Sequence, residues 1–339
     1  MSAFGASPED LKRTDDDIKV AVKAWLSNKD EAEAMYGHIS DWDTSAVTKM
    51  NGLFIELNEY DPSGCTYCDG TFNEDISRWD TSAVTTMAHM FNRQRSFNQP
   101  LEKWNTSKVL DMSGMFLSAS TFNQAIGDWD VSNVTTMERM FLRASSFNQP
   151  LEFWNTSSVT NMQSMFEDAQ CFDQAITEWN VSRVTNMGCM FKGAKSFDQD
   201  IGYWDVASVS TMSSMFQNTH RFNRPLGRWN TSSVIDMGSM FMQAENFNQS
   251  IEDWDVTAVK IMWHMFKGAR FNQPLAKWDV RNVEMMNEIF MNSTMFNQDL
   301  TAWRLHPEVD LCRAFKGAPC SFRKPIFAGF AGGRHLVKG

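Results

Sequence analysis

Cysteine, basic residues and long apolar runs are all scarce in this chain. Six cysteines in 339 residues are too few for a disulfide scaffold. The formal net charge of −10, with a pI near 5.1, argues against a nucleic-acid partner, because a phosphate backbone is bound by clustered lysine and arginine. No apolar stretch approaches the roughly 18 residues that a membrane-spanning helix needs, so we expect no membrane span.

The N-terminal sequence also lacks the marks of export. The segment Met1-Ser-Ala-Phe-Gly-Ala-Ser-Pro has no apolar stretch after a basic one, and it has no cysteine for a lipid anchor. As written, the chain is expected to stay in the cytoplasm. If a signal has been removed, the expected location is the cell surface.

What the chain has in abundance is repetition. A tryptophan recurs every 25 residues from Trp79 to Trp254. Trp42 precedes that run, and Trp278 and Trp303 follow it. A fixed period of this length is typical of a stack of similar supersecondary units rather than of a globule with one pocket. We number the residues of each coil from its tryptophan, which is position 0.

Within one coil, the apolar spacing predicts a short helix. Met112, Met115, Phe116 and Ala119, at positions 8, 11, 12 and 15, follow the i, i+3, i+4, i+7 pattern of one helical face. Ser107, at position 3, belongs to a column that most coils fill with serine. Its hydroxyl is expected to accept hydrogen bonds from the first free amides of that helix.

The second half of the coil predicts a short strand. The segment 122–126, Phe-Asn-Gln-Ala-Ile, alternates apolar and polar residues, and we expect it to pair with its copies in the neighbouring coils. Asn123 lies in a column that holds only Asn and Asp, which have a carbonyl-type acceptor in common. The column is therefore expected to accept a backbone N–H at the bend of the chain.

Methionine is abundant, and its positions favour a core. Eighteen of the 24 methionines fall at positions 8 and 11 of the coils. Thioethers could also bind copper(I), but buried methionines that fill irregular gaps explain this pattern better. No Ser-His-Asp or Cys-His arrangement and no glycine-rich phosphate loop can be argued, so we expect no enzyme activity, no catalytic residues and no cofactor.

The ends of the array and one insertion set the domain organisation. Residues 1–13 are expected to be a disordered N-terminus, and 14–37 a helical cap with an acidic start that covers the open end of the first coil. The repeat solenoid occupies 38–318 and contains an insertion at 55–71. The segment 319–339 is expected to form a C-terminal cap and a mobile tail.

The insertion holds the one compact motif with metal-ligand spacing, Cys65-Thr-Tyr-Cys68. A structural zinc site needs two more ligands. His89 in the next coil is the third candidate, and Asp61 or Asp69 is the fourth. The same two cysteines would also suit a local disulfide or redox pair, and an ordinary loop without either is the preferred interpretation.

Three recurring pieces carry a resemblance to a known family: Trp-Asp-Thr-Ser-Ala-Val-Thr-Thr-Met from Trp79, Met-Phe-x-x-Ala, and Phe-Asn-Gln. They resemble the bacterial surface protein 26-residue repeats, often labelled BspA-like leucine-rich-repeat proteins, over roughly nine-tenths of the chain. The resemblance implies an α/β fold. This would be a right-handed leucine-rich-repeat-like solenoid of about eleven 25-residue coils with short parallel strands and short helices, behind a helical N-terminal cap. Such solenoids are displayed on a surface or hold partners, and the family has no known catalytic residues.

The functional hypothesis concerns a surface. Positions 4, 9, 10, 13, 14 and 16 vary freely along the array, and they include Arg93, Arg139, Trp263 and His264. A tryptophan in a column of small polar residues is the best candidate for an exposed anchor, so Trp263 leads this set. We therefore expect a non-catalytic scaffold that binds an unidentified protein partner. The alternative is an exported adhesin that binds carbohydrate or a cell surface.

Overall fold

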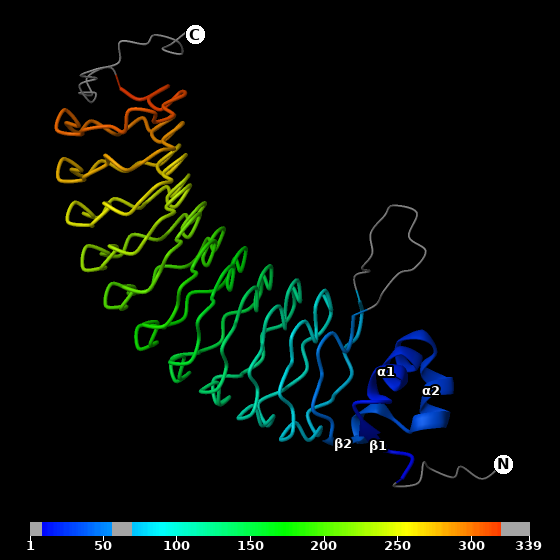
Figure 1. The fold of residues 1–339 in the computed structure, drawn as a ribbon. Helices are drawn as coiled ribbons and strands as arrows, with labels where there is room; N and C mark the ends of the chain where they lie inside the picture. The colour runs from blue at the N-terminus through cyan, green and yellow to red at the C-terminus, as the bar shows by residue number, and fades with distance from the viewer. Residues whose placement is uncertain (1–8, 56–69, 320–339) are drawn as a thin grey trace. The chain divides into compact units, whose positions relative to one another are not determined.

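The computed structural model describes residues 9–55 and 70–319 (Figure 1). Contacts divide the chain into two compact units, Met1–Val159 and Thr160–Gly339, and each contains stacked coils of the repeat. No helix in the described parts has the length and apolar character needed to cross a membrane. The assigned elements are β1 (Lys12–Thr14), α1 (Ile18–Ser27), α2 (Lys29–Tyr36), a 3-10 helix (Ile39–Asp41) and β2 (Asp43–Ala46).

The helices predicted for the repeat do not form. The segment 112–119 is a series of turns instead. The amide of Phe116 donates to the carbonyl of Met140 in the next coil, at 2.9 Å, whereas the amide of Met115 donates three residues back to Met112, at 3.2 Å. This alternation recurs from coil to coil. The apolar spacing does place those side chains in the interior, but neighbouring coils take the N–H groups that a helix would need.

The alternation depends on an unusual backbone conformation at two positions of each coil. Positions 10 and 14 have positive φ angles in every described coil, for example 58° at both Gly114 and Ser118. Each is the third residue of a four-residue turn, as Gly114 is in the turn closed by the Met115 hydrogen bond. A positive φ at the third residue is the requirement of a type II turn. The series of turns therefore brings alternate amides to the face of the next coil.

The strand predicted at 122–126 is also absent. Successive coils pair as in a parallel sheet at position 7, through single bridges such as Thr86 to Asp111 in the first unit and Thr211 to Asp236 in the second. The reason is that few consecutive backbone groups are free to pair, because turns use half of them. One further bridge among the described residues joins Gly70 to Gln94.

Side chains replace the strand hydrogen bonds, as predicted for the asparagine column. The Oδ1 of Asn98 accepts the backbone N–H of Asn123 at 2.9 Å. In the second unit, Asp198 does the same for the N–H of Asn223 at 3.0 Å. The prediction is confirmed, and it explains why Asn and Asp both occur there: only the acceptor oxygen is used.

The serine at position 3 has a different role from the one predicted. The Oδ1 of Asn105 accepts from the backbone N–H of Ser107 at 3.1 Å and from its hydroxyl at 2.7 Å. Asp80 accepts the N–H of Ser82 in the same way, at 2.8 Å. Because no helix begins here, no helical amides are free for the hydroxyl to accept. In the coils from Trp42 to Trp278, the Asp or Asn after the tryptophan is the cap, and residue 3, most often serine, donates to it.

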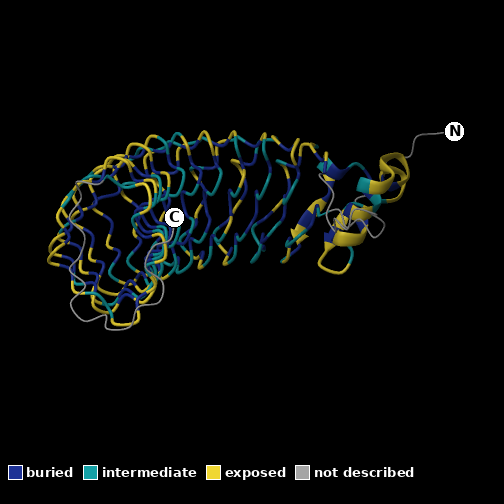
Figure 2. Cartoon of the chain, turned by 90° about the horizontal axis from the view of Figure 1, so that it is seen from above, coloured by how far each residue is buried: buried dark blue, intermediate teal, exposed yellow. Residues whose placement is uncertain are grey.

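The core of each unit consists of stacked aromatic and thioether columns. The rings of Trp104 and Trp129 stack with centroids 6.4 Å apart and 5° between their planes. The indole N–H of Trp129 donates to the carbonyl of Leu101 at 3.0 Å, so its polar atom is satisfied within the core. The methionines of positions 8 and 11, such as Met112 and Met115, are fully buried, as predicted. Each described coil contains both buried and exposed residues (Figure 2).

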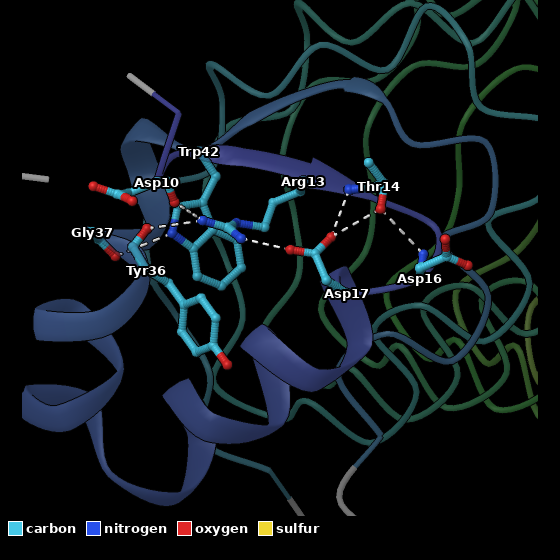
Figure 3. A network of polar contacts seen from close by, with 8 residues as sticks. All are labelled: Asp10, Arg13, Thr14, Asp16, Asp17, Tyr36, Gly37 and Trp42. Carbon is cyan, nitrogen blue, oxygen red and sulfur yellow. Dashed lines mark hydrogen bonds and ion pairs between the residues drawn. The ribbon is translucent and has the colours of Figure 1, made fainter. Parts of the chain in front are cut away.

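The N-terminal cap begins earlier than predicted. Residues 1–13 were expected to be disordered, but β1 pairs in parallel with β2, and Arg13 is buried (Figure 3). The guanidinium of Arg13 lies 5.1 Å from the ring centroids of both Tyr36 and Trp42 and pairs with Asp17 at 2.6 Å. A buried cation needs such partners, and they hold the strand in place.

The acidic residues before α1 also act differently from the predicted helix start. Asp15 accepts the backbone N–H groups of Thr48 at 2.7 Å and Lys49 at 3.0 Å, in the first coil. In later coils the amide at position 6 donates to the preceding coil, as Thr85 does to Thr48, at 2.8 Å. The carboxylate of Asp15 thus accepts the amides that a preceding coil would otherwise accept. The expected single helix is divided at Asn28, whose side chain caps α2.

We predict that the asparagine column stabilises the stack through its acceptor. Asn123→Ala leaves the amide of Asn148 without its 2.9 Å partner and should cost about 1–2 kcal/mol. Asn123→Asp keeps the acceptor, as Asp198 does, and should cost much less. Thermal unfolding of the two variants checks this. Equal losses would contradict the role of the oxygen.

We also predict that the caps at position 1 make stability sensitive to acid. Hydrogen bonds from the hydroxyl and then the amide of Ser82 lower the pKa of Asp80 below its ordinary value of 3.8. A lowered carboxyl pKa stabilises the fold above the unfolded value, and that stability is lost as the pH falls through the folded value. Asp80→Asn introduces the residue that other coils use at this position. The variant should lose less stability than the wild type between pH 5 and pH 3, by on the order of 0.5 kcal/mol because Asp80 is exposed. The melting temperature measured across this pH range checks the difference. An unchanged acid profile would contradict the assignment.

Candidate functional site

Side chains at positions 9, 10, 13 and 14 are mostly exposed or half-buried, and we name them the variable strip. Ser164 and Ser239, at position 10, are buried exceptions. All four residues proposed from the sequence for partner contact lie on it: Arg93 and Arg139 in the first unit, Trp263 and His264 in the second. Arg139 is exposed and pairs with Glu138 at 3.2 Å. Arg93 is half-buried and lies two coils earlier. The structure brings only Trp263 and His264 into contact.

The backbone of the strip favours glycine, yet most coils carry a larger residue there. Sixteen non-glycine residues in the described chain have positive φ, and all of them lie at positions 10 and 14. The left-handed region costs a residue with a Cβ roughly 1–2 kcal/mol. Glycine occupies these positions in some coils, so it is compatible with the fold: Gly52, Gly114, Gly193, Gly268 and Gly317. Most coils therefore have a non-glycine residue at positions 10 and 14, although the backbone conformation there favours glycine.

Trp263 is the largest side chain of the strip, and it packs against His264 and Gly238. It is half-buried, and its ring meets that of His264 edge-on at 4.8 Å between centroids. A Cβ on Gly238, in the preceding coil, would lie 2.7 Å from the indole Nε1. Gly238 therefore leaves the space into which the indole fits.

Glu288 joins this tryptophan pair to a network of charges. Its carboxylate lies 2.6 Å from Nζ of Lys267, 3.0 Å from Nε2 of His264 and 3.7 Å from the guanidinium of Arg313. We name Trp263, His264, Lys267, Glu288 and Arg313 the Trp263 cluster. They come from positions 9, 10 and 13 of three successive coils.

The protonation states of the cluster follow from its surroundings. The hydrogen bond from Lys267 lowers the pKa of Glu288, so this carboxylate is ionised at neutral pH. Burial, and then the charge of Lys267, lower the pKa of His264 below 6.5. His264 is therefore neutral at pH 7, and its ring N–H donates a hydrogen bond to Glu288 rather than forming an ion pair.

The sequence pointed to Trp263 and His264 but not to the other three members of the cluster. Lys267, Glu288 and Arg313 are ordinary charged residues in the sequence, without a motif. A signal was present, because coils stacked in register place position 10 of one coil beside position 10 of the next. Opposite charges at that position in Glu288 and Arg313 indicate a contact.

The predicted zinc site falls largely outside the described residues, because Cys65 and Cys68 lie there. His89 is described, and its ring lies over Gly114 of the next coil, where a Cβ would come within 2.3 Å of Nδ1. That Nδ1 is buried without a hydrogen-bond partner in the described chain. The described residues contain no group of three or more candidate metal ligands. Zinc at the insertion stays a prediction.

The sequence model of one protein family matches the repeat three times in tandem, at residues 63–170, 149–244 and 222–326. Its description is "Mycoplasma protein of unknown function, DUF285". The chain belongs to this family. The matches of the DUF285 family agree with a repeat solenoid, whereas the name of the bacterial surface protein family expected from the sequence is not the one that matches.

No curated protein matches this DUF285 chain in sequence. Among solved structures, it is similar to the crystal structure of a TLR13–ssRNA13 complex, at 10% identity and a TM-score of 0.23. The likeness covers 69% of this chain and 46% of the TLR13 chain, so the chain spans less than half the length of that neighbour. A likeness this low supports no conclusion about fold or ligand.

We predict that Glu288 holds the cluster together. Glu288→Gln removes the charge that Lys267, His264 and Arg313 share and should lower stability by about 1 kcal/mol at low salt. The deficit should shrink at high salt, because screening weakens the wild-type pairs. Urea unfolding at two ionic strengths measures both effects. A deficit that does not change with salt would show that the carboxylate acts through packing alone.

Proposed function

We propose that the chain is a non-catalytic scaffold that binds another protein through the variable strip. The observation that supports this most directly is the backbone cost of the strip. Positions 10 and 14 accept glycine, yet arginine, histidine and glutamate are kept there at positive φ, as at Arg139, His264 and Glu288. Conformational strain of this kind is concentrated at functional sites, where the side chain has a use that offsets it.

The contrast between the strip and the core supports the same proposal. Core columns repeat the same residue types from coil to coil, and their side chains are buried in the same way. The strip changes in size and charge at each coil, which suits recognition of one particular surface. Trp263 is the anchor that we expect, because tryptophan in the centre of an interface contributes most to binding.

A second candidate is the binding of carbohydrate by an exported form of the protein. It is favoured by exposed aromatic residues at position 24, outside the strip. Phe153 is 81% exposed in the first unit, and Tyr203 is 66% exposed in the second, with the guanidinium of Arg228 4.9 Å from its ring centroid. An exposed ring beside a hydrogen-bond donor is a common arrangement for stacking on a sugar.

We predict that Trp263→Ala weakens partner capture at least tenfold and changes stability little. The indole is half-buried on the surface, so its loss should lower the unfolding free energy by about 1 kcal/mol or less. Capture on the immobilised chain from an extract of the native cells, followed by quantification of the bound proteins, measures the effect.

Tyr203→Ala is the matched control, because it removes an exposed aromatic residue of the same unit outside the strip. Protein capture should survive this change. A glycan array that binds the wild type and the Trp263→Ala variant, but not the Tyr203→Ala variant, would favour the carbohydrate function instead. A large loss of stability in Trp263→Ala would place that residue in the core and contradict its role as an anchor.

A further inference from the structure

Two adjacent coils in the second unit break a hydrogen-bond rule that the others keep. At position 7 most coils carry Thr, Asn or Asp, and its side chain accepts the amide of position 9, as Asp236 accepts that of Gly238 at 2.8 Å. Residues with this role are Thr86, Asp111, Thr136, Asn161, Asn186, Thr211, Asp236 and Asp310. Besides Lys49 in the first coil, the exceptions among described coils are Ile261 and Met285.

The break leaves polar groups without partners beside Trp263. Because Ile261 and Met285 offer no acceptor, the amides of Trp263 and Asn287 have no protein partner within residues 9–55 and 70–319. The Oδ1 of Asn287 is also buried without a hydrogen-bond partner in that part of the chain. A backbone N–H without a protein partner is a donor to which a bound peptide can offer a carbonyl oxygen.

The same change creates an apolar surface. Ile261 and Met285 are paired across the bridge between their coils, so their side chains lie next to each other. Met285 is 42% exposed. Trp263 follows Ile261 by two residues, so the two side chains lie on the same side of the chain. Ile261, Trp263 and Met285 form what we name the apolar face.

The coils that carry the apolar face are also richer in basic residues, although the chain as a whole is acidic. In positions 6–16 of the last three coils there are five basic residues (Lys260, Lys267, Arg270, Arg313, Lys316) and three acidic ones (Glu284, Glu288, Asp310). The four preceding coils have two basic and four acidic residues in the same positions (Lys192, Lys195; Glu167, Asp168, Asp236, Glu245). Arg270 and Lys316 are exposed and form no ion pair with a described residue. Positive charge is thus concentrated at this end of the second unit.

We propose that the apolar face binds an extended, acidic segment of a partner protein in which acidic and apolar residues alternate. The apolar residues of the segment pack on Ile261, Met285 and Trp263. Its backbone carbonyls accept from the open amides of Trp263 and Asn287. Its carboxylates pair with Arg270 and Lys316. This inference rests on the proposed scaffold function and specifies the chemistry of the partner.

An acidic peptide fits these observations better than a nucleic acid does. A phosphate backbone would use the basic residues and could stack a base on Trp263, but it would leave Ile261 and Met285 against water. An alternating acidic and apolar segment uses the charges, the apolar side chains and the open amides together. The nucleic acid is therefore an outcome that the experiment must test.

Restoring the missing cap separates binding from structure. Ile261→Asn supplies the acceptor that Asn161 and Asn186 supply in other coils, and it removes half of the apolar pair. The melting temperature of the full chain should stay the same or rise by about 2 °C, since an amide regains its partner. Binding of a fluorescent ten-residue peptide of alternating glutamate and leucine should weaken at least tenfold, measured by anisotropy.

Matched variants isolate each contribution. Ile261→Val keeps an apolar side chain without an acceptor and should bind the peptide within about twofold of wild type. Arg270→Glu together with Lys316→Glu should weaken binding at least tenfold, and rising salt should reduce the wild-type affinity. Lys195→Glu, in the same position as Arg270 but three coils earlier, should have no effect.

Four outcomes would overturn the inference. They are no binding of the glutamate–leucine peptide, equal binding by Ile261→Asn, a lower melting temperature for Ile261→Asn, or tighter binding of a ten-residue oligothymidine than of the peptide. If the peptide fails to bind while Trp263→Ala still abolishes protein capture, the scaffold function stands and only the acidic partner is wrong. If Trp263→Ala leaves capture intact, the scaffold function fails at this surface.

Discussion

The exchange of backbone hydrogen bonds between coils is the interaction on which the rest of this structure depends. With no helix or long strand in the described coils, the amides at positions 8 to 15 alternate between partners within the coil and carbonyls of the next coil. A buried peptide group without a partner costs about 1–3 kcal/mol, so this pairing stabilises each coil that keeps it. The stacked rings of Trp104 and Trp129 and the ladder of Asn98 and Asn123 are arranged around that requirement.

Surface and core are separated by the i, i+3, i+4, i+7 spacing of the buried side chains, not by the alternation of hydrogen bonds. Positions 8 and 12, which are buried, and positions 10 and 14, which belong to the strip, all donate their amides to the next coil. The buried columns are fixed by packing, while positions 9, 10, 13 and 14 vary in residue type from coil to coil. The turns require positive φ angles at positions 10 and 14, and non-glycine residues such as Arg139 and His264 adopt this strained conformation.

The period of the tryptophans was enough to predict a stack, its buried methionines and the acceptor role of Asn123, because each depends only on residue type and repetition. The helix at 112–119 was wrong because a series of turns buries the same i, i+3, i+4, i+7 positions as a helix does. Positive φ was hidden at residues such as Ser118 and His89, since neither is the glycine that usually marks it. Of the site, Trp263 stood out by its size. Glu288 did not, because its importance comes from contacts across coils, which sequence alone does not display.

The carboxylate of Asp15 has a consequence for how such a molecule can assemble and evolve. By accepting the amides of Thr48 and Lys49, it closes the edge to which another coil, from this molecule or a second copy, would otherwise be added. Together with β1, which pairs with β2 in the same coil, Asp15 leaves fewer free backbone groups at that end for head-to-tail pairing. A repeat inserted within the array would leave this stop in place.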